Sequence, residues 1–244
     1  MRHVVWFSCG VASAVLAKMV SERHKCAIVY CDLLKDEHTD NIRFLMDCEQ
    51  WIGQPIETIK SEKYNSIDDV FEQTRYMSGV SGARCTTEMK KLPRRHFENH
   101  DDTHHFGLTA EEHKRIANFE QNNPELRCEW LLRDGFITKK RCHDIIRAAG
   151  IETPAMYKLG YKNNNCIGCV KATSVRYWNM IRRDFPDIFD ERAKRARDLG
   201  VRLARYKGER VFIEDLPPDA MIGDLEDISC GPDCGQLSLL SNKT

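Results

Sequence analysis

Short apolar runs alternate with amphipathic stretches through the first 76 residues. Buried-strand patterns occur at 3–8, 26–31 ("CAIVYC") and 55–59, and helix patterns follow them at 13–23, 39–51 and 66–76. A strand–helix–strand order needs a crossover connection, which makes neighbouring strands parallel and places helices over the sheet. The sequence therefore predicts an α/β fold, a Rossmann-like parallel sheet with helices on both faces.

The pattern is less regular after residue 76. We expect a loop at 77–93 and a second long loop at 153–169. The remaining predicted elements are strands at 103–108, 128–132 and 210–213, and helices at 111–120, 138–149 and 174–199, the last ended or kinked at Pro186. We predict a nucleotide-binding core at 1–155 and a cysteine-rich C-terminal subdomain at 156–244, with a soft boundary.

A loop of small residues follows the first predicted strand. It consists of Ser8, Cys9, Gly10, Val11, Ala12 and Ser13. Ligands of open α/β sheets bind at the carboxyl ends of strands, where small residues let backbone N–H groups approach an anion and the next helix adds its positive end. The loop lacks both the lysine of a Walker A motif and the dinucleotide pattern Gly-x-Gly-x-x-Gly. It predicts a phosphate site of another type, with a tight packing turn as the alternative.

Eleven cysteines suggest a metal centre or reactive thiols, because disulfides are rare in a reducing compartment. Cys166 and Cys169 form a C-x-x-C pair that can chelate a metal or act as a redox dithiol. Together with Cys85 and Cys234 they offer four thiolates, which suit a [4Fe–4S] cluster or, alternatively, zinc. The nine histidines show no metal-ligand spacing. Four further cysteines are expected to be small buried side chains: Cys26, Cys31, Cys48 and Cys142.

Charge and hydropathy limit the classes of partner. The chain has 37 basic and 37 acidic residues, so nucleic-acid binding would need a local basic patch and is not indicated by net charge. No apolar stretch approaches the roughly 20 residues that span a bilayer, and the N-terminus lacks the layout of a signal peptide. We expect a cytoplasmic protein without a membrane partner.

Several stretches resemble one known family. Ser8, Gly10 and Ser13 match the pyrophosphate loop Ser-Gly-Gly-x-Asp-Ser of the adenine nucleotide alpha hydrolase, or PP-loop, superfamily, whereas Cys9 and Ala12 replace its glycine and aspartate. The stretches "RCTTEMKKLP" (84–93), "GLTAEEHKR" (107–115), "NNNCIGC" and "SCGPDC" are similar to segments of the PAPS (phosphoadenosine phosphosulfate) reductase-like proteins of this superfamily. The chain thus resembles the phage and bacterial type of that family over most of its length.

The resemblance implies an enzyme that binds an adenine nucleotide, ATP or PAPS, and acts in sulfur chemistry. The nucleotide would contact the residues of the 8–13 loop together with Asp32, Lys90, Gly107 and Arg115. In a sulfonucleotide reductase, Cys230 would be the catalytic thiol and a thioredoxin-like protein the reductant. One alternative is an ATP-dependent, cluster-dependent sulfurtransferase that thiolates a nucleobase with a sulfur donor. A second alternative is a non-catalytic nucleotide sensor. Each of these interpretations is compatible with a homodimer.

Overall fold

The centre of the molecule is a five-stranded parallel sheet. The computed structural model describes residues 1–79, 82–228 and 230. The strands lie in the order β3-β2-β1-β6-β7. They are β1 (His3–Phe7), β2 (Cys26–Cys31), β3 (Glu57–Ile59), β6 (Thr103–Phe106) and β7 (Arg127–Cys128). In the parallel register Val5 pairs with Ile28 on one side and with His105 on the other.

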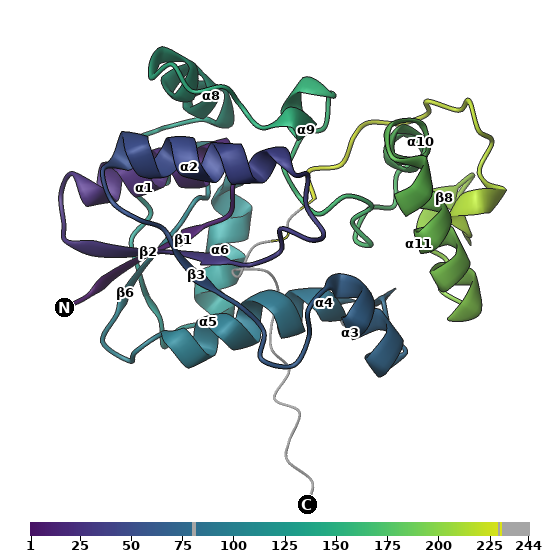
Figure 1. Cartoon of the computed structure of the whole chain (residues 1–244), viewed down its shortest axis with the longest axis horizontal. Coiled ribbons are helices and arrows are strands. Elements are labelled where there is room, and N and C mark those ends of the chain that lie inside the picture. Colours follow the sequence, from purple (N-terminus) through teal and green to yellow (C-terminus); the bar gives the residue numbers. More distant parts are fainter. Residues whose placement is uncertain (80–81, 229, 231–244) are drawn as a thin grey trace, which may run out of the picture.

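Helices cover both faces of this sheet (Figure 1). One face carries α1 (Val11–Ser21), α2 (Asp40–Ile52) and α8 (Lys139–Ala148), and the other carries α5 (Leu92–Phe97) and α6 (His113–Asn122). Val5 and Phe7 pack into the first layer, whereas Val4 and Trp6 pack into the second. Burial on both faces explains why the strand sequences are almost continuously apolar. The predicted α/β fold is confirmed.

Side-chain caps define where several helices begin. Ser66 accepts a hydrogen bond from the Asp69 N–H at 3.1 Å at the start of α3 (Ile67–Thr74), and Thr138 accepts one from the Arg141 N–H at 3.1 Å at the start of α8. Ser174 caps α10 (Val175–Asp184) in the same way. These oxygens satisfy N–H groups that have no partner within the helix.

A second lobe lies beside the sheet (Figure 1). It contains α10, α11 (Pro186–Asp198) and the hairpin β8–β9 (Ala204–Tyr206, Glu209–Val211). Its apolar core joins Phe71 of α3 to Trp178 of α10, so this core draws on both sides of residue 155. The shorter elements are β4 (Ser78–Gly79), β5 (Gly82–Ala83), α4 (Arg84–Thr86), η1 (Thr87–Lys91), η2 (Ala110–Glu112), α7 (Leu131–Asp134), α9 (Ala155–Lys158) and η3 (Ile213–Asp215).

The loop predicted at 77–93 is wrong from residue 84 onward. Arg84–Phe97 is helical throughout, with a π-helical turn at Thr87–Lys91. Pro93 is tolerated because it directly follows the π-helical turn, where the i,i+4 hydrogen-bond pattern of the helix is already interrupted. Arg84 and Glu88 also form an i,i+4 ion pair at 2.7 Å, which supports this turn.

Three other predicted elements need correction. The strand predicted at 128–132 ends at Cys128, and the chain then turns into α7. The strand predicted at 210–213 is the second arm of a hairpin, whose turn places Lys207 and Gly208 at φ values of 49° and 87° as a tight two-residue turn requires. The loop predicted at 153–169 contains the short helix α9. The break at Pro186 is confirmed, since Pro186 begins α11. Among the described residues, no helix is long and apolar enough to cross a membrane.

Candidate nucleotide pocket and thiol cluster

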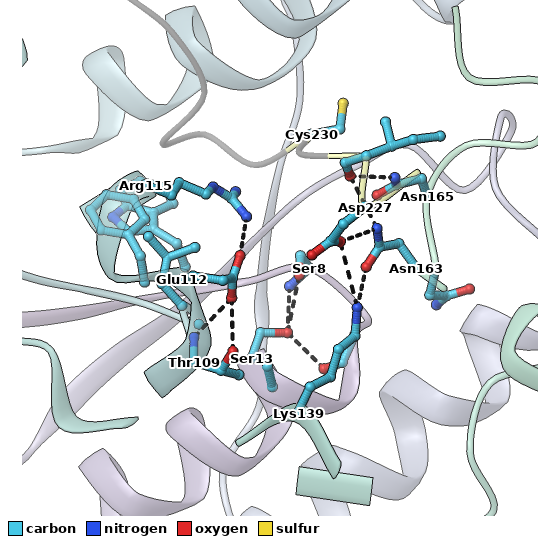
Figure 2. Close-up of a pocket in the computed structure, with 18 of the residues that line it drawn as sticks. Ser8, Ser13, Thr109, Glu112, Arg115, Lys139, Asn163, Asn165, Asp227 and Cys230 are labelled. Carbon is cyan, nitrogen blue, oxygen red and sulfur yellow. Dashed lines mark hydrogen bonds and ion pairs between the residues drawn. The ribbon is translucent and has the colours of Figure 1, made fainter. Parts of the chain in front are cut away.

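A pocket opens where the strand order changes direction. β2 lies on one side of β1 and β6 on the other, so the segments after β1 and β6 diverge and leave a crevice at the carboxyl ends of these strands. The 8–13 loop forms one wall, the segment 106–109 a second, and Asn163 to Asn165 a third (Figure 2). Of the residues predicted to bind nucleotide, the structure gathers here Ser8, Gly10, Ala12, Ser13, Lys90, Gly107 and Arg115.

The two serines of the loop are held together by hydrogen bonds. The Ser13 hydroxyl oxygen accepts from the Ser8 N–H and from the Ser8 hydroxyl, both at 3.1 Å, and it donates to the Gly10 carbonyl at 2.9 Å. Helix α1 begins at Val11, and within the described residues no side chain caps its first turn. The positive end of α1 and the Ser8 hydroxyl therefore lie at the pocket, an arrangement suited to an anion.

Gly107 allows β6 and α1 to approach closely. A Cβ atom at residue 107 would lie 2.8 Å from both the Cα and the N of Ser13, which is too close for a side chain. The absence of a side chain at Gly107 thus brings the segment after β6 directly against the serine loop.

Three residues predicted to bind nucleotide do not line this pocket. Cys9 and Val11 are fully buried in the core beneath the loop. Asp32 lines a separate cavity together with Lys35 and Lys60.

Cys9 is not an activated thiol. Its φ of 52° is the left-handed conformation that favours glycine, the residue found there in the PP-loop motif. Burial raises the pKa of the Cys9 thiol well above its ordinary value. Desolvation therefore outweighs any lowering by the nearby start of α1.

Two further side chains at the pocket form a connected ion pair. Glu112 accepts hydrogen bonds from the Thr109 N–H at 2.8 Å and the Thr109 hydroxyl at 3.1 Å, and its second oxygen accepts one from the Arg115 guanidinium. Arg115 is thereby oriented at the pocket wall (Figure 2).

Lys139 is a cation that sequence reasoning missed. Its ammonium donates to the Asn163 side-chain oxygen and lies 3.8 Å from the Asp227 carboxylate. Burial lowers the pKa of Lys139. In sequence it is one of several basic residues after a helix cap, so only the tertiary fold distinguishes it from a surface lysine.

Asp227, Ile228 and Cys230 also line the pocket (Figure 2). The Asn163 amide donates to Asp227 at 2.6 Å, and the Asn165 amide donates to the Ile228 carbonyl at 2.8 Å. The Lys90 ammonium donates to the Cys230 carbonyl at 2.7 Å. These contacts place Cys230 on the pocket wall, with its sulfur pointing away from Ser8.

The predicted metal ligands Cys85, Cys166 and Cys169 are all buried and interact electrostatically with Cys230. Burial raises the pKa of Cys85 to about 12 and that of Cys166 well above its ordinary value. We call these four residues the thiol cluster. Cys234, the predicted fourth ligand, lies outside the described residues.

The thiol of Cys230 differs from the other three. A hydrogen bond between Cys169 and Cys230 raises the pKa of Cys169 and lowers that of Cys230 well below its ordinary value. The positive charges of Lys90 and Lys171 act in the same direction on Cys230, and the Thr86 hydroxyl lies 3.7 Å from its sulfur. In return, the nearby thiols outweigh the effect of burial on Lys90 and raise its pKa.

The spacing of the thiol cluster is wider than a single zinc ion requires. With Zn–S bonds of about 2.3 Å, tetrahedral sulfurs lie roughly 3.8 Å apart. Among the described residues, no three of the cluster's sulfurs lie within 4.8 Å of one another. The donor set is all-thiol, which suits an iron–sulfur cluster.

Three of the four cysteines predicted to be buried structural side chains are so placed: Cys31, Cys48 and Cys142. Cys26 is only half-buried at the start of β2, where the strand leaves the core.

The comparisons with known proteins find a likeness among solved structures. No family model matches the chain, and no curated protein matches it. Among solved structures, it is similar to the phosphoadenylyl-sulfate (PAPS) reductase of Candida auris in a phosphate complex, with 12% sequence identity, a TM-score of 0.48, and coverage of 67% of this chain and 80% of that one. A likeness this distant says nothing about activity, so the proposal below rests on the site's own residues.

Proposed function

We propose that the chain is a sulfonucleotide reductase, which binds an adenine nucleotide bearing a sulfate in the pocket and reduces that sulfate through Cys230. One observation carries the proposal: Cys230 borders both the pocket of the serine loop and the thiol cluster. A reductase of this kind needs an anion site and a reactive thiol at one place, and Cys230 joins the two.

The pocket has the groups that phosphate binding requires. The start of α1 offers backbone N–H donors, and Lys90, Arg115 and Lys139 bring positive charge to its lining. The lining carboxylates, Glu112 and Asp227, are paired with Arg115 and Lys139. A nucleotide phosphate can replace Asp227 as the partner of Lys139, since both are oxygen anions.

The reaction that we propose is a two-step reduction. The Cys230 thiolate forms a bond to the sulfate sulfur, the bond from that sulfur to the phosphate oxygen breaks, and the electron pair leaves with the nucleotide. A thiolate of a dithiol protein then attacks the Cys230 sulfur, sulfite leaves, and a mixed disulfide forms. The second thiol of that protein displaces Cys230 as a thiol. One dithiol is oxidised to a disulfide and one sulfate is reduced to sulfite.

The thiol cluster fits an iron–sulfur cluster in this account, with Cys85, Cys166 and Cys169 as ligands and Cys230 or Cys234 beside them. When bound, such a cluster would supply positive, redox-active metal next to Cys230. The protein's own contribution is to bury the ligands and to place Lys90 and Lys171 against the sulfurs.

The test is sulfite release from PAPS by the full chain, purified anaerobically, with thioredoxin as reductant. We expect turnover in the wild type and in Cys48→Ser, a control at a buried cysteine that does not line the pocket. We expect no sulfite from Cys230→Ser. Equal rates in wild type and Cys230→Ser would refute the role of Cys230.

The second candidate is an ATP-dependent sulfurtransferase, favoured by the three buried thiols Cys85, Cys166 and Cys169 beside a nucleotide pocket. It predicts AMP and pyrophosphate that appear only when a nucleic acid acceptor is present. Nucleotide binding with neither sulfite nor AMP as a product would instead indicate a sensor.

A further inference from the structure

A second group of potential metal-binding side chains lies beside the starts of β1 and β2 and the short edge strand β7. His3 is the first residue of β1, His24 lies in the turn before β2, and Glu129 directly follows β7. One potential ligand atom from each residue lies within 4.8 Å of the other two. Three segments that are distant in sequence thus converge here, whereas the pocket lies at the carboxyl ends of β1 and β6.

The two imidazoles lie close together but are stacked, so one ring must turn before the in-plane lone pairs of both can meet at one ion. The rings of His3 and His24 are stacked, with centroids 3.9 Å apart and an angle of 9° between the planes. His3 is partly buried, whereas His24 and Glu129 are exposed and free to adjust. Adjustment is required, because ligand atoms around a tetrahedral zinc ion with bonds of about 2.0–2.1 Å lie roughly 3.4 Å apart.

A buried third histidine supports the arrangement. Nε2 of His105 lies 3.0 Å from Nδ1 of His3 and 3.9 Å from a carboxylate oxygen of Glu129. His105 is fully buried in β6. The second ring nitrogen of a metal-bound histidine usually donates a hydrogen bond to a partner that fixes the orientation of the ring. With the metal on Nε2 of His3, His105 is that partner.

We propose that His3, His24 and Glu129 bind a divalent first-row transition metal, with Zn²⁺ as the best candidate. Two imidazoles and one carboxylate are a ligand set that zinc accepts, and three protein ligands leave a position for water. The bound ion would join the start of β1 to the chain after β7, a strand of only two residues. This site is distinct from the thiol cluster in both its place and its ligands.

The experiment is a zinc titration of the full chain, purified without a polyhistidine tag and with its own N-terminus. Binding and the thermal midpoint are compared for wild type, His24→Ala, Glu129→Gln and the control His100→Ala, whose side chain is 94% exposed. Cys166→Ser removes a thiol of the thiol cluster, so it distinguishes zinc bound there from zinc bound at this site.

In each of the two ligand variants, we expect the affinity for one equivalent of zinc to fall by about 10- to 100-fold. Zinc should then no longer raise the thermal midpoint of the variant. His100→Ala and Cys166→Ser should keep that equivalent. Because His24 and Glu129 are exposed, the metal-free variants should melt like the wild type. Wild-type zinc affinity and stoichiometry in either His24→Ala or Glu129→Gln would overturn the proposal.

Discussion

Replacing Gly107 with alanine should damage the fold and the nucleotide pocket together. The added Cβ would lie 2.8 Å from the Cα and the N of Ser13 and 3.2 Å from the carbonyl carbon of Ala12. Carbon atoms in contact lie about 3.5–4.0 Å apart, so β6 and the start of α1 must separate by about 1 Å. All three neighbours are backbone atoms and cannot rotate away.

The size of the effect follows from this overlap. Overpacking of this kind costs about 1–3 kcal/mol, and a chain of this size loses roughly 2–4 °C of thermal midpoint for each kcal/mol. A 1 Å displacement of the serine loop should lower the affinity for the nucleotide and slow sulfite release, the latter on the order of 100-fold.

The assay is thermal unfolding and PAPS binding by calorimetry for Gly107→Ala beside Gly10→Ala. At Gly10 a new Cβ would meet only the Tyr157 hydroxyl at 3.4 Å and the Ser8 hydroxyl at 3.6 Å. Gly10→Ala should therefore melt within about 2 °C of the wild type, since these are ordinary contacts. A Gly107→Ala protein with the wild-type midpoint and affinity would show that β6 and α1 do not meet as described.

Three further predictions concern charge, pH and metal. Lys90→Met should slow alkylation of Cys230 near neutral pH in metal-free protein, because the lost cation no longer helps the Cys169 hydrogen bond to lower the thiol pKa. Mass spectrometry of the peptide measures the rate, and an unchanged rate contradicts the prediction. Burial lowers the pKa of His104 to about 4 in the folded protein. As the pH falls, the unfolded chain therefore binds a proton at His104 before the folded protein does. Up to ~3 kcal/mol of folding stability should be lost between about pH 6.5 and pH 4. Urea unfolding at several pH values checks this, and His104→Gln should flatten the slope. Protein purified anaerobically should contain about four irons per chain by metal analysis. Cys166→Ser should lose this iron, whereas Cys48→Ser should keep it. Wild-type protein without iron would exclude the cluster.

The sheet could be predicted from the sequence because its strands are buried on both faces. A run such as "HVVWF" followed by small residues has few alternatives to a strand, a loop and a helix. The helical run Arg84–Phe97 could not be predicted, since Gly79, Gly82 and Pro93 are ordinary signals for a loop and only packing against the second lobe overrides them.

The site could be predicted where local sequence determines it, and not where the tertiary fold does. Ser8 and Ser13 lie in one loop, and the spacing of Cys166 and Cys169 is visible directly in the sequence. By contrast, Lys139 reaches the pocket only through the packing of α8. His3 and Glu129 are distant in sequence and approach each other only because β6 alone separates β1 from β7, so the spacing of histidines in the sequence could not indicate the proposed metal site.

The central claim is that Cys230 takes the sulfonate from a nucleotide in the pocket. The most direct measurement is the intact mass of the anaerobic protein after one turnover with PAPS and no reductant, followed by peptide mapping. The account predicts the mass of one added SO₃ group on Cys230, absent in Cys230→Ser and released as sulfite when thioredoxin is added. An unmodified Cys230 under conditions in which PAPS is bound, or the same adduct in Cys230→Ser, would contradict it.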